Sequence, residues 1–257
     1  MHGRLKLIAD RQAGVFSRSQ ALASGCTPDE IVRLLGDGRW QRIRRGQYAE
    51  KVDRTALPSG EQTRWDHRQK VHAAMNSLRS GSVAVSHQSA LVFHGLPLWG
   101  LDLSRVHVSR LDEQSGGVVA GVQHHLGKLT NADLAVVEGR FVTSVTCAVG
   151  ESACTASFEV AVVSIDAALR DHDVSEEDRQ SLLERSEFWP GSTTARAALR
   201  FGNRLSESVG ESRLRVREDR LRALGLTVVR AEWSDFGRPA QLVAAIRQAL
   251  ARASRAA

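Results

Sequence analysis

In the first fifty residues, apolar positions recur twice at helical spacing and then give way to an alternating run that is rich in arginine. Ile31, Leu34 and Leu35 form an apolar stripe at i, i+3 and i+4, which predicts one helix. A shorter helix precedes it and ends at Gly25. Another short helix over residues 4–13 would complete a unit of three helices.

Polar residues mark where the second and third of these helices begin. Ser17 and Gln20 have the Ser/Thr-x-x-Glu/Gln spacing of a capping box, in which each side chain satisfies a backbone N–H group of the other. Thr27 and Glu30 repeat that spacing, and Pro28 lies in the first turn, where its missing N–H group costs nothing. Both helices are therefore expected to have well-defined starts.

The segment after these helices carries four arginines in the seven residues 39–45, interleaved with Trp40 and Ile43. Gly46 predicts a turn into a second strand, so we expect a basic hairpin. Two short helices followed by a basic hairpin are typical of a winged helix-turn-helix. In that fold the second helix enters the major groove of DNA and the hairpin, or wing, contacts phosphates.

Arginines on an edge strand also protect against aggregation, so a solvated edge strand is the alternative interpretation of this hairpin. The two capped helices directly before it favour contact with double-stranded DNA. Trp40 and Tyr48 are expected to anchor the hairpin to the helices. The candidate DNA-binding residues are Thr27, Arg33, Arg39, Arg42, Arg44, Arg45 and Gln47.

A linker around Pro58 is predicted to precede a central domain in which helix and strand patterns mix. Its helices over residues 145–153 and 158–170 are apolar on nearly every face, so we expect both to be buried against a sheet. The other predicted helices cover residues 61–79, 86–94, a stretch from 175, and 193–201. The predicted strands cover residues 82–85, 106–108, 118–124, 135–137 and 141–143, with a tight turn at 138–140.

The last part of the chain predicts a helix over residues 206–224, a strand over 227–233 and an amphipathic helix that starts at Pro239. Overall the pattern indicates an α/β (α+β) chain. The predicted domains are a winged helix-turn-helix (residues 1–57), a central α/β domain (58–200) and a C-terminal segment (201–257).

A chain of 257 residues that is 42% hydrophobic can bury sizeable cores, so the composition favours a globular protein. Its net charge of +6 is uneven: residues 1–57 and 201–257 each carry 11 Lys/Arg against 6 Asp/Glu, and residues 58–200 carry 13 against 17. Basic ends suit nucleic acid. Three cysteines without a C-x-x-C pair, no signal peptide and no long apolar run predict a cytoplasmic protein that does not bind membranes.

Residues 4–49, which end in GRWQRIRRGQYA, resemble the N-terminal winged-helix domain of the AbiEi-type antitoxins of type IV toxin–antitoxin systems. SHQSALVFHGLPLWG (86–100), VHVSR (106–110) and residues 141–170 are similar to the middle domain of the same proteins. The resemblance implies a transcriptional regulator that represses its own operon. It also implies a protein partner, namely a nucleotidyltransferase-like toxin or the target of that toxin, and leaves the oligomeric state open.

SESVGESRLR (206–215) and REDRLRALGLTVVRAEW (217–233) resemble parts of a domain related to the very-short-patch-repair endonucleases. This implies an alternative function, a metal-dependent nuclease guided by the winged helix. Such nucleases hold a divalent metal with an Asp and a Glu-x-Lys on neighbouring strands. The segment that carries them is missing after Arg215, and no lysine follows Lys128. We therefore expect a degenerate nuclease-like segment, no catalytic residues and no enzymatic activity.

The arginines of that segment fit phosphate contact and a solvated helix face equally well; they are Arg213, Arg215, Arg217, Arg220 and Arg222. Five central histidines raise the question of a metal site; they are His87, His94, His107, His124 and His125. His87 and His94 lie roughly two turns apart on one helix, too far to share a zinc ion without a third element. No zinc motif is complete, so we expect ordinary hydrogen bonds, no metal and no cofactor.

Overall fold

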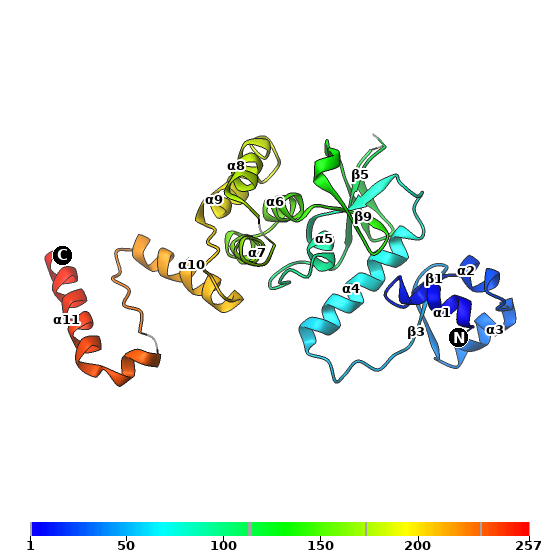
Figure 1. Ribbon diagram of the computed structural model, residues 1–257, viewed down its shortest axis with the longest axis horizontal. Coiled ribbons are helices and arrows are strands. Elements are labelled where there is room, and N and C mark those ends of the chain that lie inside the picture. Colours follow the sequence, from blue (N-terminus) through cyan, green and yellow to red (C-terminus); the bar gives the residue numbers. More distant parts are fainter. Residues whose placement is uncertain (1, 113–114, 173, 232, 257) are drawn as a thin grey trace.

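The computed structural model describes residues 2–112, 115–172, 174–231 and 233–256. The chain runs from a small N-terminal unit through a six-stranded sheet and a group of helices to a C-terminal helix that stands apart (Figure 1). Helices and strands mix along the chain up to β9 and only helices follow in the described residues, and the predicted α+β class is confirmed. Within the described residues, none of the helices is both long and apolar enough to cross a lipid bilayer.

The N-terminal unit contains three helices around a small antiparallel sheet of strand order β1-β3-β2. Ser17 and Gln20 form the predicted capping box. Of the second predicted box one half is present, since the Thr27 side chain accepts a hydrogen bond from the backbone N–H of Glu30. The elements are α1 (Gly3–Asp10), β1 (Val15–Ser17), α2 (Arg18–Ala23), α3 (Pro28–Gly36), β2 (Trp40–Arg44) and β3 (Gln47–Glu50). Strand β1 was not predicted, because three residues are too few for a strand pattern.

An aromatic cluster forms the core of this unit. The ring of Phe16 meets that of Trp40 edge-on, with 4.6 Å between centroids, and lies 6.3 Å from that of Tyr48. Trp40 is 3% exposed and Tyr48 is 6% exposed. The predicted anchoring of the hairpin by these two side chains is therefore confirmed.

Helix α4 (Ser59–Met75) joins the N-terminal unit to the sheet and packs against β1 and β2. The Gln69 side chain donates to the carbonyl oxygen of Ala13 over 2.9 Å. The Asn76 amide, just after the helix, donates to Oε1 of Gln47 over 3.1 Å. These bonds fix the N-terminal unit against the helix. The helix ends at Met75, four residues before the predicted end at residue 79.

The larger sheet is mixed, with strand order β6-β7-β5-β4-β9-β8. Its strands are β4 (Val83–Val85), β5 (Val106–Arg110), β6 (Gly117–Val119), β7 (Val122–His125), β8 (Leu134–Val137) and β9 (Arg140–Thr143). The single strand predicted over residues 118–124 is wrong, because the chain reverses at Ala120 (φ +48°) and Gly121 (φ +77°) into the hairpin β6–β7. Two consecutive left-handed residues make the tight turn that antiparallel strands favour. Glu138 and Gly139 form the predicted turn between β8 and β9 in the same way.

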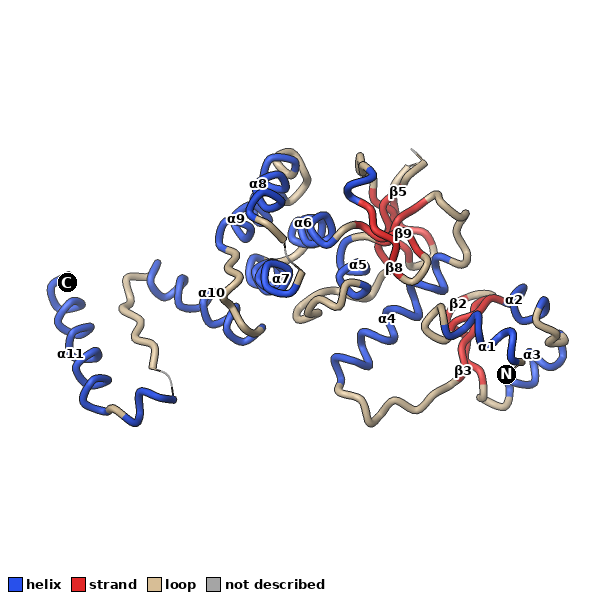
Figure 2. Tube along the Cα trace, in the orientation of Figure 1, coloured by secondary structure: helices blue, strands red, loops and turns tan. Residues whose placement is uncertain are grey.

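Helix α5 (His87–Phe93) lies on the sheet, where it contacts β5 and β9 (Figure 2). Helices α6 (Val145–Thr155) and α7 (Phe158–Asp171) are buried as predicted, but their main contacts are with α5, α9, α10 and each other. The predicted packing against the sheet is confirmed in part. Helix α6 reaches the sheet through Glu151, which bonds to Ser109 of β5 and Thr143 of β9, while α4 and α5 supply the main helix contacts of the sheet. The remaining helices of this group are α8 (Glu176–Arg185), α9 (Ser192–Phe201) and α10 (Val209–Ala223).

Beyond α10 the chain extends away from the other helices. The strand predicted over residues 227–233 is wrong for 227–231, which pair with no described strand, and Glu232 lies outside the described residues. A strand needs a neighbour to receive its backbone hydrogen bonds, and the segment has none in the described chain. A short helical turn (Trp233–Gly237) and α11 (Pro239–Ala256) follow. The three-domain division stays a prediction; Val216 of α10 belongs to the same buried cluster as Ile165 of α7.

Candidate functional site

Four of the candidate DNA-binding arginines are exposed. Arg33 projects from α3 next to Val32, whose side chain is 69% exposed although it is apolar. Arg39 precedes β2, Arg42 lies within it, and Arg45 occupies the turn before β3, where Gly46 has a φ of +72°. We call Arg33, Arg39, Arg42 and Arg45 the N-terminal arginines.

Thr27 lies at the beginning of α3, on the surface. Its hydroxyl oxygen accepts the Glu30 N–H over 3.2 Å, and the backbone N–H groups of the first helical turn point the same way along the axis. Such an end attracts phosphate groups. Arg18 also lies on this surface: it is the first residue of α2, and its backbone N–H donates to the carbonyl of Gly46 at the tip of the hairpin. The arginine pattern of the hairpin did not point to Arg18, although this residue directly follows a capping serine in the sequence.

The two other candidates, Arg44 and Gln47, lie where the N-terminal unit meets the rest of the chain. A register shift in the β2–β3 ladder between Arg42 and Arg44 accompanies this difference, and Nη2 of Arg44 lies 3.5 Å from the carbonyl oxygen of Ala120. Burial lowers the pKa of Arg44. Gln47 is 5% exposed, and its Oε1 accepts the bond from Asn76. Both side chains therefore contact protein in this structure.

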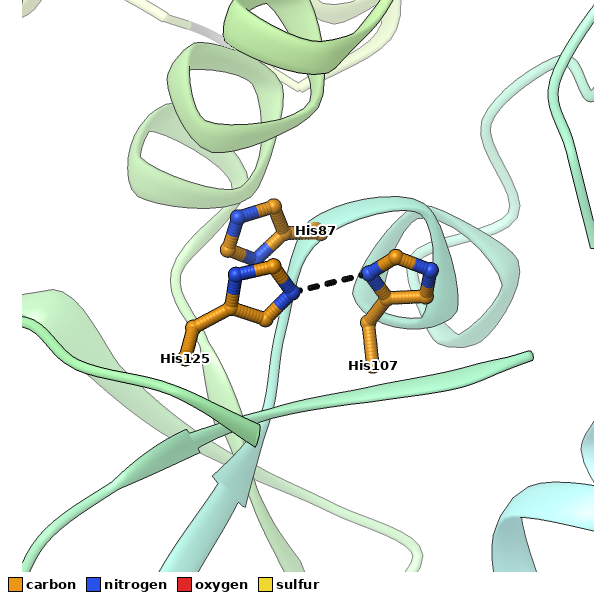
Figure 3. A group of neighbouring side chains, drawn as sticks. All are labelled: His87, His107 and His125. Carbon is orange, nitrogen blue, oxygen red and sulfur yellow. Dashed lines mark hydrogen bonds between the residues drawn. The ribbon is translucent and has the colours of Figure 1, made fainter. Parts of the chain in front are cut away.

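A second cluster of functional groups lies in the central part of the chain. His87 begins α5, His107 lies in β5 and His125 ends β7, and the three imidazoles converge (Figure 3). One nitrogen of each ring lies within 4.8 Å of those of the other two. Nδ1 of His107 and Nε2 of His125 share a hydrogen bond of 2.9 Å, and the rings of His87 and His125 stack with centroids 3.6 Å apart. We call these three residues the histidine cluster.

A buried carboxyl group, that of Glu151, lies next to the histidine cluster. Glu151 accepts hydrogen bonds from the backbone N–H of His87 (3.2 Å), the Ser109 hydroxyl (3.1 Å) and the Thr143 hydroxyl (3.1 Å). Burial raises the pKa of Glu151 to about 7. Burial, together with the neighbouring imidazoles, lowers the pKa of His125 to about 4.

Burial also lowers the pKa of His107 to about 4 and that of His87 well below its ordinary value. The other two central histidines lie outside the cluster. Nε2 of His94 bonds to the carbonyl of Thr143 over 2.7 Å, which confirms the predicted ordinary hydrogen bond for this residue. Nδ1 of His124 lies 3.5 Å from the guanidinium of Arg110. Sequence spacing did not reveal the cluster, because its members come from three elements that only the fold brings together.

A cavity of about 710 Å³ opens beside the histidine cluster. His87, His125 and Glu151 form part of its wall, together with Cys154. Lys128 and Arg185 add positive charge to the same wall. The cavity is large enough for a small molecule, and the cluster is accessible from it.

Residues 4–51 match the model of a family described as "Transcriptional regulator, AbiEi antitoxin". The match covers the three helices and three strands of the N-terminal unit, and it confirms the resemblance predicted for residues 4–49. The match supports a regulatory, antitoxin-type role. The resemblance of residues 206–233 to endonucleases stays a prediction.

Among solved structures, the crystal structure of the RV2827C protein from Mycobacterium tuberculosis is similar, with 14% sequence identity and a TM-score of 0.48. The similarity covers 81% of this chain and 77% of that one. No curated protein shows significant similarity to the chain.

Proposed function

We propose that the protein is a DNA-binding transcriptional regulator of the antitoxin type, which docks on duplex DNA as a winged helix-turn-helix. One observation carries the proposal. Within the segment that matches the regulator family, two capped helices are followed by a hairpin region on which Arg39, Arg42 and Arg45 are exposed. Exposed arginines beside a helix pair can contact the phosphate backbone of DNA and position the second helix in a groove.

Each part of this surface has a role in the proposal. Helix α3 enters the major groove, where Arg33 suits the acceptor edge of guanine and the exposed Val32 suits a thymine methyl group. Thr27, at the start of α3, lies near a phosphate. Arg39, Arg42 and Arg45 contact phosphates or the minor groove. Arg44 and Gln47 are assigned to the contacts between the N-terminal unit and the rest of the chain.

Binding of a mixed-sequence duplex, measured over a series of salt concentrations, tests the proposal. Each phosphate contact that is lost lowers the slope of log K against log salt by roughly one. We expect the double variant Arg42→Ala, Arg45→Ala to bind more weakly at every salt concentration and to lose about two from that slope.

The matched control removes two exposed arginines elsewhere, Arg200→Ala and Arg247→Ala, and therefore lowers the net charge equally. This control should keep the wild-type slope. If both double variants lost the same amount, general charge would explain the binding. If the hairpin variant bound as tightly as wild type throughout, the assignment of the hairpin would be wrong.

The antitoxin role has a finer form: the protein represses its own operon, as part of a type IV toxin–antitoxin system, and counteracts toxicity through its central residues. The partner is a nucleotidyltransferase-like toxin or its target. In cells that carry the neighbouring gene and a reporter fused to the upstream DNA, Arg42→Ala with Arg45→Ala should abolish repression and still prevent toxicity. If this folded variant lost both repression and protection against toxicity, the assignment of the two functions to different parts of the chain would be wrong.

No observation favours the alternative, a metal-dependent nuclease. In the described part of the chain no strand follows Thr143, and Glu218 is paired with Arg222 and Arg230. We propose that the protein is not an enzyme, so supercoiled plasmid with Mg²⁺ or Mn²⁺ should stay intact in its presence. Nicking that disappears in a Glu232→Gln, Asp235→Asn variant would restore the nuclease.

A further inference from the structure

The histidine cluster has the composition of a transition-metal site. Imidazole nitrogen is a preferred ligand of Zn²⁺, and three protein ligands with an open fourth position are a common arrangement for this ion. We propose that His87, His107 and His125 together bind one divalent transition-metal cation, with Zn²⁺ as the best fit. The proposal is independent of the DNA-binding function.

The distances are close to those that zinc needs. With zinc–nitrogen bonds of about 2.0–2.1 Å, the ligand nitrogens of a tetrahedral site lie about 3.3 Å apart. In the histidine cluster two nitrogens are 2.9 Å apart and all three lie within 4.8 Å. Small rotations of the side chains, which would unstack His87 from His125, are enough to bring the three nitrogens around one ion.

The backbone at His87 is unusual for a residue with a side chain. Its φ is +52°, in the left-handed region that most residues avoid, although it starts a helix. Such strain tends to occur at functional sites, where the surrounding structure enforces it. Here the Glu151 carboxylate holds the backbone N–H of His87, and the ring is placed against His125.

Polar groups behind the ligands can orient them. Metal-binding histidines usually give their second nitrogen to a carboxylate, carbonyl or similar acceptor. Nδ1 of His87 lies 3.0 Å from the Ser86 hydroxyl and 3.7 Å from the buried carboxyl group of Glu151.

His107 has a comparable partner in Gln88, whose amide nitrogen lies 3.0 Å from its Nε2. Oε1 of Gln88 is buried without a hydrogen-bond partner among the described residues. Turning this amide over would give Nε2–H of His107 an oxygen acceptor and leave Nδ1 free for the cation. The exchange would cost the bond that the amide now donates to the Asp102 carbonyl.

A second group, His2, Cys26 and Glu30, also places possible ligand atoms within 4.8 Å of one another. Its histidine is exposed, and its carboxyl group, that of Glu30, is only half-buried. The experiment must therefore separate the two groups.

The test measures zinc bound by the full chain after treatment with a chelator, dialysis against Zn²⁺ and removal of free ion. We expect wild type to bind about one zinc ion per chain, and the variants His125→Asn and His107→Asn to bind none. His124→Asn is the matched control, because it removes the neighbouring histidine of the same strand, and it should keep the wild-type content. Cys26→Ala should keep it as well.

Two further readouts guard against misfolded variants. His125 is only partly buried, so its variant is expected to retain the wild-type circular dichroism spectrum. Zinc should raise the melting temperature of wild type and of Cys26→Ala, but not of His125→Asn, because an ion stabilises only the state that binds it. Wild type without bound zinc, or zinc that is lost in Cys26→Ala and retained in His125→Asn, would overturn the proposal.

Discussion

Trp40 belongs to the buried core of the N-terminal unit. It is nearly fully buried and packs edge-on against Phe16. We expect Trp40→Ala to lower the free energy of unfolding by about 3–5 kcal/mol, because it removes a large apolar side chain and leaves a cavity. Urea unfolding measures this, and Val32→Ala, at an exposed apolar position, should change it by less than about 0.5 kcal/mol. Wild-type stability with lost DNA binding in the Trp40 variant would instead make Trp40 a DNA contact.

At the scale of single residues, the sequence predicts whether a side chain is structural better than it predicts where that side chain points. The burial of Trp40 and Tyr48 follows from aromatic residues placed beside a basic hairpin. Arg42 and Arg44 look alike in the sequence, yet Arg42 is exposed and Arg44 reaches the carbonyl of Ala120, 76 residues away. That difference arises from a register shift and from a contact across the fold, and neither leaves a local pattern.

At the scale of helices and strands, local chemistry predicted what it controls. Capping residues set the starts of α2 and α3, and Gly139 marked the turn between β8 and β9. The turn at Ala120 was missed, because alanine seldom adopts a left-handed conformation. The strand over 227–233 was predicted from β-branched residues alone, but pairing depends on a neighbour that the segment lacks in the described chain. The histidine cluster was missed for the same kind of reason, since three elements build it.

The packing of α10 on α7 depends on a buried ion pair. Asp166 is fully buried and accepts bonds of 2.7 Å from both the Arg215 guanidinium and the backbone N–H of Asn203. We expect Asp166→Ala to cost about 3–5 kcal/mol of stability, because it leaves a largely buried arginine without its partner. Asp171→Ala breaks a more exposed pair with Arg170 and should cost no more than about 1 kcal/mol. Equal urea midpoints for the two variants would show that α10 is held by other contacts.

At the scale of the whole molecule, the buried histidines make stability depend on pH. Burial lowers the pKa of His67 to about 4 and that of His72 to about 3. The unfolded chain binds protons on these side chains near pH 6.5, where the folded chain does not. The stabilisation is therefore complete above about pH 6.5 and is lost as the pH falls through the folded values, by on the order of 3 kcal/mol for each residue.

Glu151 acts in the opposite direction, because its raised pKa favours the folded state at lower pH. Several buried or partly buried histidines have lowered pKa values, including His107 and His125 of the histidine cluster, and together they outweigh one carboxyl group. The urea midpoint of the chain, measured with a chelator present, should therefore fall from about pH 7.5 to about pH 5. His67→Gln should make this fall shallower. An unchanged pH dependence in that variant would mean that His67 does not contribute.

Through the contact between Arg44 and Ala120, the hairpin β6–β7 is connected both to the proposed DNA-binding unit and to the proposed zinc site. Its turn touches the N-terminal unit, and its last strand residue, His125, belongs to the proposed zinc site. If zinc favours one position of this hairpin, and that position changes the affinity of the N-terminal unit for DNA, the two affinities are linked. Thermodynamics then requires DNA to change the affinity for zinc by the same factor by which zinc changes the affinity for DNA. Zinc titrations with and without a duplex would give this factor from one side, and DNA titrations with and without zinc from the other.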